Sequence, residues 1–318
     1  MKQRTITAAI LIAICLPLLI LGSYYLTAAV VLIGCAGVYE LMTARRKNNP
    51  EVEKYPLFVM ILSFIAVIGL VLFNYDITTS NVTLNYNFST GVLTKVGFSV
   101  GNIAIFLVLL LCSSIVSSRF KISDAFYMFT MVMVISFGLQ GFLYIRGIPL
   151  NENLIGVTKV QDYAFESING IYLCVYLLVT TMMTDTFAYI GGMLYRKTGR
   201  PVHKLIERVS PKKTVEGAIC GTFFGTLFGS LVFGLLVCNF ELSLPWYVFV
   251  PLTLLLSITA QFGDLIFSSI KRHYQIKDFS DLLPGHGGVL DRVDSLLINS
   301  ILLSSILFTT IQMFGLFA

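Results

Sequence analysis

Residues 245–268 read PWYVFVPLTLLLSITAQFGDLIFS and contain one charged side chain, that of Asp264. Apolar runs of about 18 residues or more are long enough to cross a bilayer as a helix. The whole chain of 318 residues has a similar character, because 56% of its residues are hydrophobic and only 12% are charged. Soluble domains are about 25% charged. The sequence therefore predicts an integral membrane protein.

Several other segments have comparable length and hydropathy, which predicts a polytopic protein with nine transmembrane helices. We expect no strands, because only helices or closed barrels cross a bilayer, and these segments lack the alternation of apolar and polar residues that barrel strands show. The expected fold class is therefore all-α. The predicted spans are residues 6–22, 24–43, 57–74, 101–118, 124–145, 169–192, 216–238, 245–268 and 295–317.

The lysine and arginine residues test the number of spans, because they concentrate in the cytoplasmic loops of membrane proteins. With nine spans and a cytoplasmic N-terminus, 19 of the 22 lysines and arginines fall on the cytoplasmic side. We therefore expect the N-terminus in the cytoplasm and the C-terminus outside. Residues 1–23 also fit a signal peptide. The next span follows at once, which favours an uncleaved helical hairpin.

Functional candidates are unevenly distributed along the chain. Residues 1–165 contain few, and we expect these N-terminal helices to act as a scaffold that provides lipid access and oligomer contacts. Residues 166–318 contain most of them and are expected to form a catalytic transmembrane region. The charged cytoplasmic loops of this region cover residues 193–215 and 269–294.

Ionisable side chains inside a span are costly, so each one is a functional candidate by default. Asp185 lies deep in the span 169–192, and a functional role is favoured, although a buried aspartate can also bond a polar group on a neighbouring helix. For Glu40, in the span 24–43, a structural role is favoured instead.

The end of the eighth predicted span carries a stripe of polar residues. Because they recur every three or four positions, they share one face of a helix. A polar stripe is costly against lipid, so we expect it to face a cavity or another helix. The four residues are Gln261, Asp264, Ser268 and Lys271.

The segment SPKKTVEG, residues 210–217, precedes the seventh span. Ser210 and the proline after it are expected to form a turn. The N-terminus of a helix offers free N–H groups and a positive dipole, and Lys212 and Lys213 beside it make a phosphate site. An anchor on anionic lipid headgroups is the alternative explanation of the lysines. Glu216 fits a capping role in the first turn of the helix.

Residues 277–295, KDFSDLLPGHGGVLDRVDS, place four aspartates, two cations, a histidine and three glycines between the last two spans. Paired glycines let a backbone approach a ligand closely. Carboxylates with few histidines and no nearby cysteine suit hard cations such as Mg²⁺, and we expect Asp264 and Asp291 to hold one. Such residues at a membrane favour metal-dependent phosphoryl or nucleotidyl transfer to a lipid.

Residues 268–294 resemble the signature of the CDP-diacylglycerol synthases, also called phosphatidate cytidylyltransferases. The family pattern is S-x-x-K-R, four residues, K-D, then P-x-H-G-G, two residues and D-R-x-D, and every fixed position matches. The segment 210–217 and the segment DTFAYIGG, residues 185–192, also look like family motifs. The stretch between Gly192 and Ser210 departs from the family in being longer and more basic.

The resemblance implies an enzyme that joins CTP and phosphatidate into CDP-diacylglycerol and pyrophosphate. The implied catalytic residues are Asp264, Asp291, Lys271 and Arg292, with the metal on Asp264 and Asp291. The implied substrate-binding residues are Asp185, Ser210, Lys212, Lys213, Ser268, Arg272, Lys277, Asp278, His286, Gly287, Gly288 and Asp294.

The implied cofactor is Mg²⁺, with or without a monovalent cation such as K⁺. The expected partners are CTP, phosphatidic acid in the bilayer and a second copy of the chain as a homodimer, but not nucleic acid. The expected location is a bacterial inner or plasma membrane, with the active site on the cytoplasmic side. The alternatives are a CDP-archaeol synthase, a CTP-dependent polyprenol kinase, or an ion-coupled transporter with Asp185 and Asp264 as an ion relay.

Overall fold

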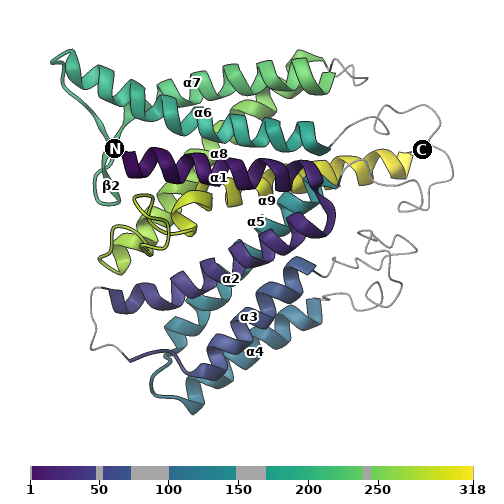
Figure 1. Ribbon diagram of the computed structural model, residues 1–318, viewed down its shortest axis with the longest axis vertical. Helices are drawn as coiled ribbons and strands as arrows, with labels where there is room; N and C mark the ends of the chain where they lie inside the picture. Colours follow the sequence, from purple (N-terminus) through teal and green to yellow (C-terminus); the bar gives the residue numbers. More distant parts are fainter. Residues whose placement is uncertain (1, 48–52, 73–99, 148–169, 239–244, 318) are drawn as a thin grey trace. The chain divides into compact units, whose positions relative to one another are not determined.

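The computed structural model describes residues 2–47, 53–72, 100–147, 170–238 and 245–317. Within these ranges the chain is almost entirely helical (Figure 1). The helices are α1 (Lys2–Leu21), α2 (Ser23–Lys47), α3 (Leu57–Leu72), α4 (Val100–Val116), α5 (Ile122–Arg146), α6 (Gly170–Lys197), α7 (Val215–Val232), α8 (Trp246–His273) and α9 (Leu290–Phe317). A π-helix, η3 (Phe233–Cys238), continues α7.

Each predicted span overlaps one of these helices, so the all-α class expected for a polytopic membrane protein is confirmed for the described part of the chain. Among the described residues, six helices are long and apolar enough to cross a membrane, namely α2, α5, α6, α7 with η3, α8 and α9. The apolar parts of α1, α3 and α4 are shorter. The 16 residues of α3 extend about 24 Å, whereas the hydrocarbon core is about 30 Å thick. Nine crossings and the sidedness of the termini stay predictions.

The chain divides into two compact units. Unit 1 contains α1 to α4, most of α5, and the segment Asp278–Arg292, which is distant from these helices in the sequence. Unit 2 contains α6 to α8 and the part of α9 from Val293 onward. The functional division into a scaffold and a catalytic region stays a prediction.

In unit 1, α2 lies close to its neighbours because it carries two small residues at the contacts. A methyl group at Gly34 would lie 2.8 Å from Val67 of α3, and one at Gly37 would lie 2.9 Å from Leu290. Such separations are too short for carbon atoms, so an alanine at either position would require the neighbouring side chain to move. Gly34 therefore lets α2 lie close to α3, and Gly37 lets it lie close to the start of α9.

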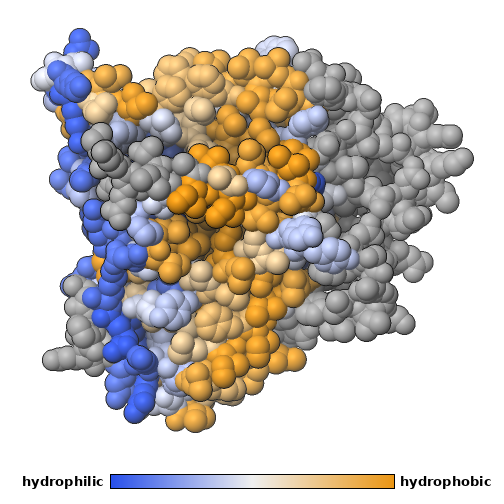
Figure 2. Space-filling view, viewed as in Figure 1, coloured by the Kyte–Doolittle hydropathy of each residue, from blue (hydrophilic) through white to orange (hydrophobic). Residues whose placement is uncertain are grey.

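In unit 2, α7 has two opposite faces. The buried face consists of Gly217, Gly221, Gly225 and Gly229. A methyl group at Gly221 would lie 2.6 Å from the carbonyl oxygen of Thr184, so the backbones of α6 and α7 are in direct contact. The opposite face exposes Ile219, Phe223, Leu227 and Leu231. Figure 2 shows hydrophobic side chains along α6 and α7, as expected of surfaces that face lipid.

Replacing Gly225 by alanine is expected to destabilise the protein, because the added methyl group would overlap the Thr184 hydroxyl, which hydrogen-bonds Ser257. Overpacking of this kind costs about 1–3 kcal/mol. The measurement is the midpoint of thermal unfolding in detergent. The matched control is Gly234→Ala, since the atom nearest to that added methyl group is Phe249 Cζ at 4.0 Å. Equal midpoints for the two variants would contradict the close packing of α6 and α7.

A two-stranded antiparallel hairpin joins α6 to α7, so the expectation that strands have no place was wrong for this loop. Strand β1 (Lys204–Ile206) pairs with β2 (Ser210–Thr214). The turn lies at residues 207–209, where Val209 N donates to Ile206 O over 3.2 Å, and not at Ser210 and the following proline as predicted. A bilayer interior excludes isolated strands, but this polar loop lies between two helices, and its two halves can form backbone hydrogen bonds with each other.

Candidate active site

The centre of the site in unit 2 is the carboxylate of Asp264 on α8. Lys213 Nζ, at the end of β2, forms an ion pair with Asp264 Oδ2 over 2.5 Å. Ser268 Oγ, one turn further along α8, donates to Asp264 Oδ1 over 3.1 Å. Three members of the polar stripe predicted on this helix therefore have protein partners, as expected of a face that does not contact lipid. Its first member, Gln261, donates to Thr222 Oγ1 of α7 over 2.7 Å.

Two further aspartates approach Asp264 from other helices. Asp185 on α6 interacts electrostatically with Asp264 and Lys213, and it faces Ser295 at the start of α9. Asp294 on α9 interacts electrostatically with Asp264, Asp185 and Lys271. In unit 2, three carboxylates and two lysines from α6, α8, α9 and the hairpin therefore interact. All five were predicted to be site residues, namely Asp185, Asp264, Asp294, Lys213 and Lys271.

The position of Lys213 is fixed by its neighbour Thr214, which is both the last residue of β2 and the N-cap of α7. Thr214 has an extended backbone and its hydroxyl accepts the Gly217 N–H over 3.1 Å, which makes it the N-cap of the helix. Glu216 lies in the first turn of α7 as expected, where its carboxylate accepts its own backbone N–H, and its Oε1 also accepts the backbone N–H of His203 over 3.1 Å. Glu216 thereby ties the residue before β1 to the first turn of α7.

The remaining cations of unit 2 are placed more peripherally. Arg272 donates to two backbone carbonyls, Val209 O over 3.3 Å and Ile276 O over 3.0 Å, so it ties the end of α8 to the hairpin. Lys212 is exposed on β2, and Lys277 is exposed after α8. Among the described residues, none of these three predicted substrate contacts is seen to bond to Asp264, and their roles stay predictions.

Residues 278–289, the signature loop, form a tight turn in unit 1 ahead of α9. Leu283 N donates to Gly287 O over 2.9 Å, and His286 N donates to Leu283 O over 2.8 Å. Gly287 has a φ of +82°, a conformation that side chains rarely adopt. The glycine pair predicted to give backbone freedom does so at this position. Gly288 is required for another reason, because a methyl group there would meet the carboxylate of Glu40.

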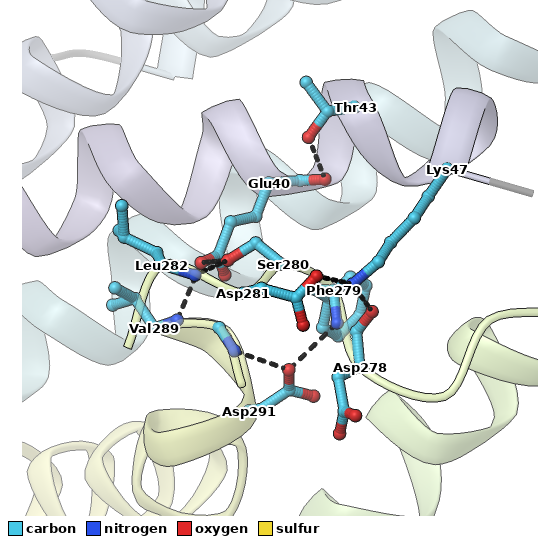
Figure 3. Close-up of polar contacts among 11 residues, drawn as sticks. Glu40, Thr43, Lys47, Asp278, Phe279, Ser280, Asp281, Leu282, Val289 and Asp291 are labelled. Atoms are coloured by element: carbon cyan, nitrogen blue, oxygen red, sulfur yellow. Dashed lines mark hydrogen bonds and ion pairs between the residues drawn. The ribbon is translucent and has the colours of Figure 1, made fainter. Parts of the chain in front are cut away.

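Asp291, in the first turn of α9, closes the signature loop. Its Oδ2 accepts the N–H groups of Phe279 and Gly288, each over 2.9 Å (Figure 3). The carboxylate therefore joins the beginning of the loop to its end. Arg292, the next residue, is exposed. Asp264 belongs to unit 2 and Asp291 to unit 1, so a metal ion shared by these two residues stays a prediction.

Two residues of α2 that were not among the predicted site residues hold the same loop. Glu40 accepts hydrogen bonds from Ser280, Val289 and Leu290 (Figure 3). Lys47 Nζ donates to the carbonyl oxygen of Asp278 over 3.1 Å. The structural role favoured for Glu40 agrees with these bonds. Its link to the signature was missed, although a charged residue inside a span is a visible signal.

Among the described residues, no group of three or more His, Cys, Asp or Glu side chains is arranged to hold a metal ion. The two predicted ligands, Asp264 and Asp291, carry the carboxylate oxygens that suit a hard cation such as Mg²⁺, and the metal site stays a prediction.

Comparison with known proteins places the chain in a family. Residues 2–310 match the model of the "Cytidylyltransferase family". The chain belongs to this family. Its relatives include the phosphatidate cytidylyltransferase of Staphylococcus haemolyticus (strain JCSC1435), which is 31% identical over 296 residues, covering 93% of this chain and 94% of the relative. Another is the phosphatidate cytidylyltransferase of Bacillus subtilis (strain 168), 30% identical over 299 residues with the same coverage.

Membership of the cytidylyltransferase family confirms the resemblance inferred from the signature. The protein is a nucleotidyltransferase and an integral membrane protein. The alternative of an ion-coupled transporter is not supported, because the match extends over nearly the whole chain. The assignment of the described carboxylates, lysines and signature loop to the site of this activity stays a prediction.

Proposed function

We propose that this enzyme transfers the cytidylyl group of CTP to the phosphate of phosphatidate, which yields CDP-diacylglycerol and pyrophosphate. The observation that carries the proposal is the similarity, over 93% of the chain, to relatives named phosphatidate cytidylyltransferase. The complete signature around Asp291 supports the same reaction. The product is a precursor for phospholipid synthesis.

The reaction requires an enzyme that brings two anions together. The phosphate of phosphatidate is already ionised at neutral pH, so its attack on the α-phosphate of CTP needs no strong base. The main barrier is electrostatic repulsion, which fixed cations reduce. Lys213 forms an ion pair with Asp264, and Lys271 interacts electrostatically with Asp294, so a carboxylate influences each of these charges. We assign these two lysines to the phosphates of the substrates, together with Arg292.

The other candidates would bind and orient the substrates. His286, Gly287 and Gly288 lie in a tight turn whose backbone can close around a phosphate. Asp185 and Asp294 would keep Lys213 and Lys271 in place. The acyl chains of phosphatidate would lie between helices, open to the bilayer.

We also propose that Asp264 and Asp291 hold Mg²⁺. A bound Mg²⁺ would neutralise phosphate charge and polarise the α-phosphate of CTP. The carboxylate donors fit this ion. The further proposals are a role for a monovalent cation, a homodimer, and an active site on the cytoplasmic side of a bacterial plasma membrane. The sidedness is supported by the distribution of lysine and arginine.

Purified protein given CTP labelled in its cytidine and phosphatidate is expected to form a labelled lipid and to release pyrophosphate. EDTA is expected to stop the reaction and added Mg²⁺ to restore it, because the proposed ion would neutralise phosphate charge. Undiminished turnover in EDTA would contradict the metal proposal. Release of CDP in place of pyrophosphate would indicate a lipid kinase, and activity only with an archaeol phospholipid would indicate a CDP-archaeol synthase.

A further inference from the structure

We propose that Glu40 of α2 is a positioning residue for the reaction, which acts by holding the signature loop and the start of α9 in their active shape. The inference rests on the proposed function only in assuming that this loop binds CTP. It concerns a residue that lies outside the signature, about 240 positions earlier in the chain.

The carboxylate of Glu40 is buried, with 1% of the residue exposed, and it is fully engaged by one segment. Oε1 accepts hydrogen bonds from Ser280 Oγ over 2.6 Å and from Val289 N over 2.7 Å. Oε2 accepts one from Leu290 N over 2.9 Å (Figure 3). Hydrogen bonds to a charged acceptor are about twice as strong as neutral ones. A buried carboxylate with these three donors fixes both ends of the loop to α2.

The start of α9 needs such an acceptor because its own sequence does not provide one. The first N–H groups of a helix have no partner within the helix, and a Ser, Thr, Asp or Asn at the N-cap usually accepts one of them. Val289 occupies that position here, ahead of Leu290 as the first helical residue. Glu40 does not replace such a side chain, which would accept the N–H of the second or third helical residue. It accepts the N–H groups just before these, of Val289 and Leu290, and its negative charge is favourable at this end of the helix.

The carboxylates of Glu40 and Asp291 accept the N–H groups of three successive residues. Gly288 N donates to Asp291 Oδ2, and the next two N–H groups, of Val289 and Leu290, donate to Glu40. A methyl group at Gly288 would lie 2.7 Å from each carboxylate oxygen of Glu40. Since the two acidic residues hold adjacent parts of one turn, a shift at Glu40 displaces the backbone that Asp291 binds.

A second contact from α2 acts on the beginning of the loop. Lys47, two turns beyond Glu40, binds the carbonyl oxygen of Asp278 and forms an ion pair with Asp281 Oδ2 over 3.1 Å. The ion pair is exposed and contributes little by itself. The buried Glu40 is therefore the residue to test.

The test uses Glu40→Gln, which keeps the size of the side chain but replaces one oxygen by an N–H donor that opposes a backbone N–H. The expected result is an increase of about tenfold in the KM for CTP with a lower kcat, because small displacements of binding groups have large effects. A smaller amount of folded protein would lower the rate and leave KM unchanged. Glu53→Gln is the matched control, since Glu53 forms an exposed ion pair with Arg119 in the same unit.

Hydrogen exchange followed by mass spectrometry gives a second readout that needs no turnover. Faster exchange in Glu40→Gln is expected in peptides covering residues 279–292 and not in those from α3 or α5. Ser280→Ala, which removes one of the three donors, is expected to change the same peptides less. An unchanged KM, or faster exchange spread evenly over unit 1, would overturn the proposal. Because exchange is measured without substrate, it decides the role of Glu40 even if phosphatidate is not the acceptor.

Discussion

Replacing Asp264 by alanine or asparagine is expected to abolish turnover, a loss of about 10³-fold or more, while the protein remains folded. Asp264 is paired with Lys213 and bonded by Ser268, and it lies among the charges contributed by α6 and α9. Its removal leaves Lys213 without this partner and takes away a carboxylate that we assign to Mg²⁺. The measurement is the initial rate with CTP and phosphatidate, at several concentrations of Mg²⁺.

The control for Asp264 is Glu207→Gln, a change of the same kind at an exposed position in the turn of the hairpin. It is expected to leave the rate unchanged. Lys213→Ala separates the two roles of Asp264. If Asp264 served only to hold Lys213, both variants would lose the same activity and would need the same Mg²⁺ concentration as the wild type. Near-normal rates in Asp264→Asn would remove the residue from the site.

Replacing Asp291 is expected to have an effect of similar size, with an informative difference between two variants. Asp291→Ala removes the acceptor of the Phe279 and Gly288 N–H groups, so it opens the signature loop and is expected to abolish turnover. Asp291→Asn keeps one oxygen that can accept these bonds and loses only the charge. We expect this variant also to lose about 10³-fold in rate, since the charge is assigned to the metal.

The matched control for Asp291 lies in the same loop. Asp281 is 85% exposed and forms a surface ion pair with Lys47, so Asp281→Asn is expected to keep nearly full activity. Thermal unfolding and hydrogen exchange of the loop would show which variants keep its shape. Full activity in Asp291→Asn with an intact loop would mean that Asp291 acts through its hydrogen bonds alone, and the proposed metal ligand would be wrong.

Much of the fold could be predicted because hydropathy is a local property of the sequence. Each predicted span overlaps a helix, and the bond between Ser268 and Asp264 follows from their spacing of four residues on α8. The hairpin could not be predicted in the same way. Its pairing of Lys204 with Thr214 depends on a turn whose position the Ser-Pro pair did not reveal.

The part of the site that escaped prediction depends on contacts between distant residues. The signature identified Asp291, but nothing near it in the sequence points to Glu40, which lies about 250 positions away. Conversely, the approach of Asp185 and Asp294 to Asp264 follows from helix packing, which the motifs suggested only through family resemblance. Single-sequence patterns therefore identified residues that the fold brings together, such as Lys213 and Asp264, but not Glu40, which holds the signature loop.

The two-faced helix α7 limits how this protein can change during evolution. Its glycines, such as Gly221, touch α6, while residues such as Phe223 lie on the opposite side. Each inserted or deleted residue turns the rest of a helix by about 100°. A single insertion near the middle would move residues such as Phe224 into the place of Gly225 and turn the glycines beyond it away from α6. Homologous sequences should therefore tolerate substitution on the outer side of α7 far more readily than any shift of its helical phase.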